Sequence, residues 1–195
     1  MLHDRCIAPF ARFLLCCFIL LVCGNLQAEI QTDVELRYGV LFPSSSLVRE
    51  LYGNVLPSYQ IEATVSMCGC YSLWTSLDFT KGRGNRCACD VKTWLNLYTW
   101  GLGVKGHYCL ASCLEGYLGI GMTCANTHVK NKRCCFDEKV SRVSVGGIVK
   151  GGLTYALDCN WFIDLFCDYT YQPVHFERHT NVGGITTGLG IGYTF

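Results

Sequence analysis

The sequence predicts an all-β fold, an eight-stranded antiparallel up-and-down transmembrane β-barrel, on three observations. Apolar and non-apolar residues alternate along eight segments that begin after residue 33, and a period of two is the mark of a strand with two different faces. Most of these segments run to nine residues or more, about the length at which a tilted strand crosses a bilayer. Long and short connections alternate between them, as they do between the two ends of a membrane barrel.

The eight segments are 34–42, 59–68, 71–80, 91–104, 114–122, 143–155, 161–171 and 185–195. In chain order, representative residues of their apolar faces are Leu36, Ile61, Leu77, Leu95, Ile120, Val145, Leu165 and Ile191. The opposite faces carry mostly Gly, Ser and Thr with a few charges, which suits the crowded lumen of a narrow barrel. In the fourth segment the apolar positions change phase after Leu97, which predicts a bulge or an early end of that strand. A secreted, disulfide-rich sandwich is the alternative fold, because its strands also alternate.

The connections divide into two groups. The long ones are 43–58, 81–90, 125–141 and 173–182, and the short ones are 69–70, 105–113 and 158–160. Long loops on one side and short turns on the other are typical of an outer-membrane barrel, with the turns in the periplasm. The turn at 105–113 is longer than this pattern leads one to expect.

Composition excludes several other classes of protein. Of the 195 residues 50% are hydrophobic, and the formal net charge is +1. Neither a disordered chain nor a strongly basic nucleic-acid binder is expected from these values. After residue 28 no stretch holds the roughly 20 consecutive apolar residues that a membrane-spanning helix needs.

Residues 1–28 predict a cleaved secretory signal peptide. Basic residues near the N-terminus precede an apolar run at 13–23, and small or polar residues follow up to Ala28, which is the order found in such signals. Cleavage after Ala28 leaves 29–195 as one barrel domain. Lipid attachment at Cys23 is less well supported, because Val22 is bulky where a small residue is usual.

The C-terminal sequence GGITTGLGIGYTF carries the most specific resemblance. With the signal peptide and the eight segments, it resembles the small outer-membrane barrels of Gram-negative bacteria, of the opacity-protein and OmpA/OmpX type, over Glu29 to Phe195. The resemblance implies a location in the bacterial outer membrane, in contact with lipid and lipopolysaccharide. It also implies a recognition signal for the barrel-assembly machinery, formed by Leu189, Ile191, Tyr193 and Phe195.

Cysteine content is the departure from that family. Removal of residues 1–28 takes away four of the 15 cysteines and leaves eleven, an odd number, so at least one thiol is free or pairs with another molecule. In this respect the chain resembles the cysteine-rich envelope proteins of certain obligate intracellular bacteria. That second resemblance implies disulfide cross-links to other envelope proteins.

The disulfide candidates fall on both sides of the membrane. Those near the predicted periplasmic turns are Cys68, Cys70, Cys109, Cys113 and Cys159, and those in the long loops are Cys87, Cys89, Cys134 and Cys135. Links within the protein, such as one between the second and third long loops, and links to a neighbouring protein are both compatible with these positions. Zinc binding is the rival interpretation, but the chain has no CxxC pair, so no metal and no cofactor is expected.

In the predicted barrel, ten charged residues lie on the strand faces that point into the lumen. They are Glu35, Arg37, Glu62, Asp78, Lys92, Glu115, Arg142, Lys150, Asp164 and Asp168. The aromatic residues expected beside them are Trp74, Trp94, Tyr117, Phe162 and Phe166. A network of ion pairs that fills the lumen is one interpretation, because buried charges must be paired or solvated; a narrow pore is the other.

The function predicted from these features is structural. No esterase or acyltransferase motif surrounds the histidines of the mature chain, so we expect a non-enzymatic envelope protein reinforced by disulfides. The alternatives are an adhesin that acts through its long loops and a pore for small solutes. Bases in the second and third long loops would contact lipopolysaccharide phosphates or a host polyanion, or would form a solvated rim.

Overall fold

The computed structural model describes residues 31–68, 70–86, 91–133, 136–175 and 179–195. The predicted signal peptide, 1–28, lies outside the described residues and stays a prediction. In the part of the chain that is described, no helix is long and apolar enough to cross a membrane.

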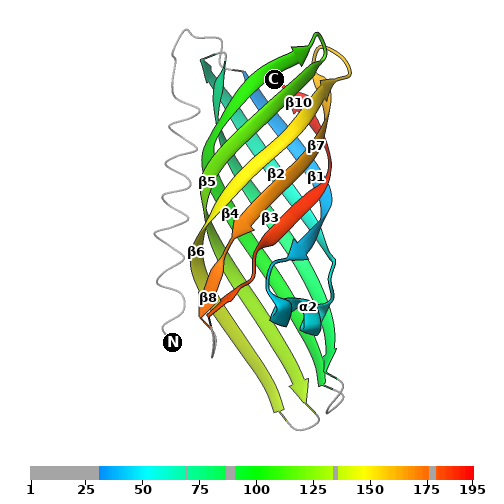
Figure 1. Ribbon diagram of the computed structural model, residues 1–195, viewed down its shortest axis with the longest axis vertical. Coiled ribbons are helices and arrows are strands. Elements are labelled where there is room, and N and C mark those ends of the chain that lie inside the picture. Colours follow the sequence, from blue (N-terminus) through cyan, green and yellow to red (C-terminus); the bar gives the residue numbers. More distant parts are fainter. Residues whose placement is uncertain (1–30, 69, 87–90, 134–135, 176–178) are drawn as a thin grey trace.

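Eight antiparallel strands close into a barrel (Figure 1), which confirms the predicted fold. They are β1 (Thr32–Pro43), β2 (Leu56–Cys68), β3 (Tyr71–Arg86), β4 (Val91–Ala111), β5 (Leu114–Arg133), β6 (Phe136–Ala156), β7 (Trp161–Tyr171) and β10 (Gly184–Thr194). Each strand pairs with its neighbours in the chain, and β1 closes the barrel on β10. The remaining elements are the helix α2 (Ser46–Tyr52) and a separate hairpin of β8 (Pro173–His175) and β9 (His179–Asn181).

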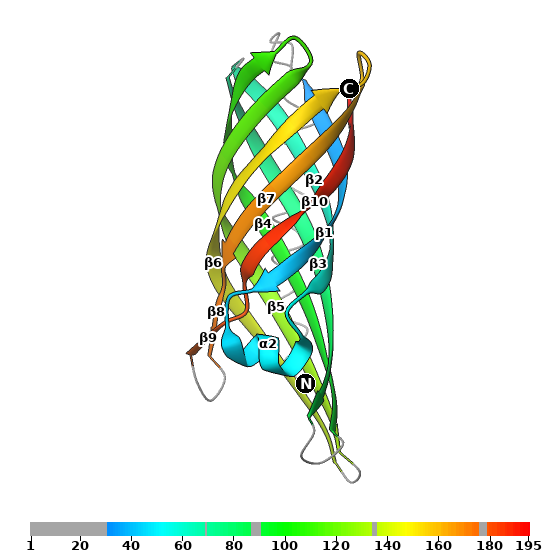
Figure 2. The same ribbon diagram turned by 45° about the vertical axis from the view of Figure 1, so that its right-hand side comes forward.

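The two ends of the barrel differ. The short turns and the C-terminus lie at one end, and α2 and the β8–β9 hairpin lie at the other (Figures 1 and 2). We call these the turn end and the loop end. The long turn expected at 105–113 is wrong: β4 continues to Ala111 and pairs with β5, which begins at Leu114. The register shift of this ladder falls between Cys109 and Ala111.

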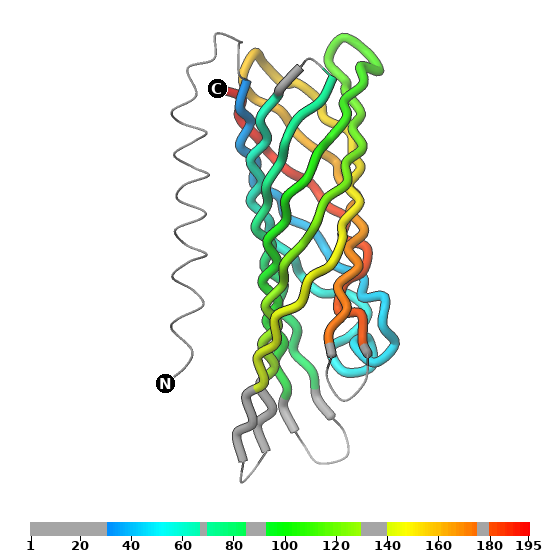
Figure 3. The backbone as a smooth tube through the Cα atoms, turned by 90° about the vertical axis from the view of Figure 1, so that its left-hand side faces the viewer, coloured from blue at the N-terminus to red at the C-terminus, as the bar shows by residue number. Residues whose placement is uncertain are grey.

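At the loop end, β3 to β6 continue past the other strands (Figures 2 and 3). We call this four-stranded part the extension; it comprises 81–86, 91–96, 128–133 and 136–141. Of these residues, 91–96 were predicted as strand, whereas 81–86, 128–133 and 136–141 fall in predicted long loops. Their backbones nevertheless stay paired in register across all four strands, from Lys81↔Asn96 to His128↔Ser141. Pairing of the backbone depends on the continuous ladder and not on an apolar face, so polar residues extend the sheet.

The outward face is apolar over the length of the barrel. Its exposed residues include Leu36, Tyr38, Ile61, Leu77, Leu102, Leu118, Ile120, Met122, Val149, Leu165, Leu189 and Ile191. They alternate with buried Gly, Ser, Thr and charged residues on the inward face. The alternation therefore has the opposite sense to that of a water-soluble barrel.

Strand β4 departs from the expected faces. Leu95 and Leu97 are buried inside the barrel, at 3% and 6% exposure, and the half-buried Trp94 lies on the opposite face. No register shift interrupts β4 between Lys92 and Cys109, so the bulge or early strand end predicted after Leu97 is wrong. The cause is that the inward face itself turns apolar near the loop end.

An apolar cap closes the loop end of the lumen. Its buried residues are Leu41, Val48, Leu56, Leu95, Leu97, Ala125, Val174 and Val182. They come from the barrel strands, from α2 and from the segment that carries the β8–β9 hairpin. Helix α2 packs against the inward face of the extension, where Gly82 leaves room for Tyr52. The cap thus separates the lumen from solvent at the loop end.

Candidate functional site

Arg37 on β1 joins several acidic side chains in the middle of the lumen. Its Nε lies 2.8 Å from Glu35 Oε1, and its Nη1 lies 3.1 Å from Glu62 Oε2. Its Nη2 lies 2.9 Å from Asp164 Oδ2, and Asp168 Oδ2 is 3.8 Å from Nη1. One guanidinium therefore connects β1 with β2 and β7, and its planar fork of donors suits such a junction.

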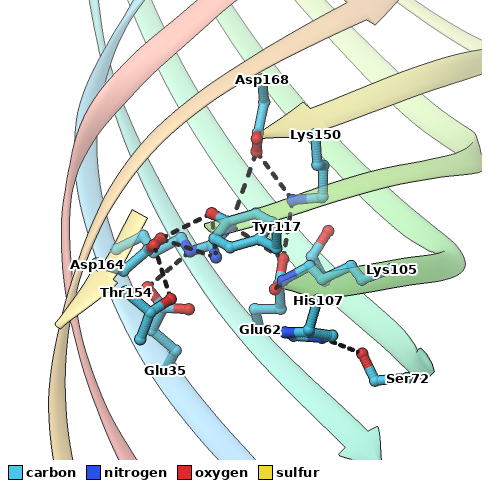
Figure 4. Close-up of polar contacts among 12 residues, drawn as sticks. Glu35, Glu62, Ser72, Lys105, His107, Tyr117, Lys150, Thr154, Asp164 and Asp168 are labelled. Atoms are coloured by element: carbon cyan, nitrogen blue, oxygen red, sulfur yellow. Dashed lines mark hydrogen bonds and ion pairs between the residues drawn. The ribbon is translucent and has the colours of Figure 1, made fainter. Parts of the chain in front are cut away.

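Glu62 on β2 is the acidic counterpart of Arg37. Its carboxylate contacts three bases: Arg37, Lys105 and Lys150. Lys150 Nζ lies 2.8 Å from Glu62 Oε2 and 2.9 Å from Asp168 Oδ2 (Figure 4). Glu62 is 1% exposed and Lys150 is 0% exposed, so charge pairing takes the place of hydration for both.

Aromatic rings complete this layer. The Tyr117 hydroxyl donates to Asp164 Oδ2 at 2.9 Å and accepts from Arg37 Nη2 at 3.0 Å. Lys150 Nζ lies 4.7 Å from the centroid of the Trp74 ring. The Trp74 ring fits because glycines face it: a Cβ on Gly121 would lie 2.5 Å from the ring. We call this set of residues the charged layer.

The charged layer holds five acidic and three basic side chains. They are Glu35, Glu62, Asp78, Asp164 and Asp168, with Arg37, Lys105 and Lys150. Two cavities flank it. A cavity of about 30 Å³ lies beside Asp78 toward the cap, and one of about 200 Å³ lies at the turn end, lined by Lys105, His107 and Glu115 among others.

At the turn end a serine, a histidine and a glutamate are hydrogen-bonded in series. Ser72 Oγ lies 2.6 Å from His107 Nε2 (Figure 4), and Glu115 Oε1 contacts His107 Nδ1. This order of contacts is the one that activates a serine nucleophile. Ser72, however, is 2% exposed and does not line the cavity at the turn end. The Ser72 hydroxyl is therefore buried beside that cavity and not part of its wall.

The charged residues named from the sequence fall into three groups. Glu35, Arg37, Glu62, Lys150, Asp164 and Asp168 lie together in the charged layer. Asp78, in the same layer, accepts a hydrogen bond from Ser76, whereas Glu115 pairs with His107 nearer the turn end. Arg142 is exposed on the part of β6 that lies beyond its pairing with β7, and the side chain of Lys92 lies outside what is described.

Lys105 and His107 were not predicted for the lumen. The expected turn at 105–113 hid them, although the alternation of β4 continues inward through Gly101 and Gly103 to both residues. Extending the period of two across that turn would have found them.

The cysteines that the structure describes are unpaired. Cys70, Cys109, Cys113 and Cys159 are exposed at the turn end, and Cys124 and Cys167 lie on the outward face of β5 and β7. Cys87, Cys89, Cys134 and Cys135 lie outside the described residues, as does the side chain of Cys68. The link expected between the second and third long loops falls in that part and stays a prediction.

The proposed assembly signal lies on the outward face of β10 near the turn end. Leu189, Ile191 and Phe195 are exposed there. Tyr193 packs against Trp161 with ring centroids 5.1 Å apart, and against Phe195 at 4.9 Å.

A closed barrel with an apolar outer face and a charged interior is the architecture of small membrane barrels, and solved structures bear out the likeness. The outer membrane protein OprG from Pseudomonas aeruginosa is 11% identical, with a TM-score of 0.63 over 85% of this chain and 96% of that one. Ail, the attachment invasion locus protein of Yersinia pestis, solved with the heparin analogue sucrose octasulfate, is 15% identical, with a TM-score of 0.60 over 86% and 100%. Neisserial surface protein A is 20% identical, with a TM-score of 0.59 over 86% and 98%.

No protein-family model and no curated protein matches the sequence. The likeness to solved structures shows that the chain has the fold of the small eight-stranded outer-membrane β-barrels.

Proposed function

We propose that the chain is an integral protein of the bacterial outer membrane with a structural, non-enzymatic role in the envelope. The observation that carries this proposal is the combination of an apolar outer belt with a lumen filled by the charged layer. An exposed apolar surface of this extent is unstable in water, and a closed barrel leaves no unpaired strand edge in hydrocarbon. Export by residues 1–28, contact with lipid and lipopolysaccharide, and recognition of the β10 end by the assembly machinery belong to the same proposal.

The filled lumen favours a structural role over a pore. The charged layer occupies the middle of the barrel, and the apolar cap closes the loop end. An ion that crossed the barrel would have to displace paired charges and then pass an apolar seal, and each step is costly.

The thiols at the turn end support disulfide reinforcement. Cys70, Cys109, Cys113 and Cys159 are exposed and, in the described structure, unpaired. In the proposed orientation they face the periplasm, an oxidising compartment. Exposed thiols that are unpaired among the described residues are placed to cross-link to neighbouring cysteine-rich envelope proteins.

Electrophoresis tests both parts of this proposal. The refolded mature chain is expected to migrate differently in cold SDS before and after boiling, with or without reductant. In native envelopes a reductant-sensitive ladder is expected, and replacement of the four turn-end cysteines by serine should remove it. Cys167→Ser, on the lipid-facing side, is the matched control and should leave the ladder intact. Loss of structure on reduction alone would overturn the proposal of a membrane barrel that is stable without its disulfides.

The non-enzymatic role rests on the burial of Ser72. We assign the contacts from Ser72 through His107 to Glu115 to cross-strand support of β3, β4 and β5. Ester hydrolysis by the refolded chain that disappears in Ser72→Ala would overturn this assignment.

Adhesion is the second candidate function, and the extension favours it. In the proposed orientation its four strands project outside the cell, beyond the rest of the barrel. The similar structure of Ail is that of an attachment invasion locus protein. Bacteria that display the chain would then bind host cells, and shortening the extension would abolish that binding without loss of the barrel.

A further inference from the structure

An aromatic row crosses the outward face of the barrel at the foot of the extension. Phe79 on β3 lies directly opposite Tyr98 on β4, with ring centroids 4.9 Å apart. Tyr98 also contacts His128 on β5 at 6.0 Å. Aromatic residues of this kind gather where hydrocarbon meets the headgroups. The row therefore marks the outer edge of the hydrocarbon layer in the proposed orientation.

Two bases follow this row on the same outward face. Lys81 and Arg83 on β3 are exposed, and the Lys81 ammonium lies 4.8 Å from the centroid of the Phe79 ring. The register places Lys81 opposite Asn96 and Arg83 opposite Trp94. The level of these bases, one row beyond the aromatic residues, is the level of lipid phosphates.

Both bases lack a counterion in the described structure. Ion pairs there involve the lumen and the turn end, and neither Lys81 nor Arg83 takes part in one. Two residues apart on one strand, they lie roughly 7 Å apart. Like charges at that distance repel each other, so an anion between them would be favourable.

Lys81 and Arg83, which we call the basic patch, lie on one side of the rim. On β7, β10 and β1 the exposed outward residues near the loop end are Tyr169, Tyr171, Ile185 and Phe42. Helix α2 covers the inward face of the extension, at Gly82 and Gly84, and leaves the outward face free. Among the described residues, an anionic lipid thus meets outward-facing bases beside β3 and not beside β7, β10 or β1.

We propose that Lys81 and Arg83, with Asn96 and His128 beside them, bind a phosphate group of a glycolipid in the outer leaflet. This inference rests on the proposed insertion into the outer membrane. Ammonium and guanidinium groups donate charge-assisted hydrogen bonds to phosphate oxygens. The acyl chains of the same lipid lie against Leu77 and the Phe79–Tyr98 row. The location at the foot of the extension, rather than at its tip, favours a lipid over a soluble polysaccharide.

Lipid retention in nanodiscs tests this site. The mature chain is refolded into phosphatidylcholine nanodiscs that contain a bis-phosphorylated glucosamine-disaccharide lipid or the same lipid without phosphates. Retained lipid is then measured by native mass spectrometry. The phosphorylated form is expected to stay bound, and Lys81→Gln with Arg83→Gln should lower its affinity about tenfold or more, because each removes a hydrogen bond to a charged group.

Arg142→Gln is the matched control. It removes one positive charge at a similar level from an exposed residue on the inward-facing side of β6, and should leave lipid retention unchanged. Equal retention by the Lys81→Gln/Arg83→Gln variant, or binding of heparin in place of the lipid, would overturn the site. A chain that enters nanodiscs but retains no phosphorylated lipid refutes the site alone, whereas a chain that does not enter them refutes the proposed function as well.

Discussion

Glu62 is the residue on which the stability of the lumen depends most directly. Arg37, Lys105 and Lys150 all contact its carboxylate. Removal of its charge would leave buried Lys105 without an ion-pair partner in the described structure, and Arg37 and Lys150 would each lose one of theirs. Loss of one partner from a buried ion pair is costly because the other charge stays buried and uncompensated.

Glu62→Gln is therefore expected to lower the free energy of unfolding by about 3–5 kcal/mol. Urea unfolding of the refolded barrel in detergent measures the change. Asp78→Asn is the matched control, because Asp78 faces the same lumen but accepts only a hydrogen bond from Ser76 in the described structure; it should cost about 1 kcal/mol or less. Equal losses in both variants would show that the ion pairs of Glu62 contribute no specific stability.

Gly121 and Gly147 make a second comparison between single residues. A Cβ at Gly121 would lie 2.5 Å from the Leu102 carbonyl oxygen and from the Trp74 ring, whereas at Gly147 the nearest atom is 3.8 Å away. Gly121→Ala is expected to lower stability by about 1–3 kcal/mol through overpacking. Gly147→Ala should leave the urea midpoint unchanged or slightly higher. Urea unfolding of both variants measures the two effects.

The inward face of strand β4 meets two different environments along its length. Its inward face passes from Lys105 in the charged layer to Leu97 and Leu95 in the apolar cap. The backbone keeps one phase throughout, and only the chemistry of the lumen changes along it.

Spin labels placed one at a time on β4 would test this single phase. Labels at Tyr98 and Leu102 are expected to be accessible to oxygen dissolved in the lipid, and labels at Leu97 and Thr99 should be protected. Alternation should continue without a break from 97 to 102. High oxygen accessibility at Leu97 would instead support the bulge predicted from the sequence.

The same strand explains what the sequence could and could not predict. Alternation located all eight strands, because a lipid-facing surface must be apolar along its whole length. The assumption that apolar residues face lipid then failed at Leu95 and Leu97, where tertiary packing under α2 provides a second apolar environment. Nothing local to residues 91–97 distinguishes the two environments. The short helix α2 was missed for a similar reason, since its one buried residue, Val48, gives no periodic signal.

For the whole molecule, the charged layer and the apolar cap form two barriers in series. We expect no discrete conductance when the refolded chain is added to planar bilayers. Replacement of residues 46–52 by a Gly-Ser linker removes part of the cap but leaves the charged layer. This variant should also show no discrete conductance. Discrete channels in the linker variant would show that the charged layer alone does not seal the barrel.

The sequence predicted in part which residues belong to the charged layer, but it did not predict which of them form ion pairs. Strand parity placed Arg37, Glu62 and Asp164 inside. Which of them meet depends on the stagger with which β1 closes on β10, and no local pattern encodes that stagger. The exposure of Arg142 has the same origin, because it lies beyond the last pair of β6 with β7, Gly147↔Tyr171.

The pairing of β1 with β10 also constrains the order of events during biogenesis. Asp33 and Thr194 meet across 161 residues of chain, and the ladder runs from there to Pro43↔Gly184. Strand β1 therefore has no partner on its second edge until β10, the last strand of the barrel, has been synthesised. With the proposed export, a chain that emerges on the far side of the inner membrane cannot complete its fold early, and must be kept from aggregating until β10 has arrived.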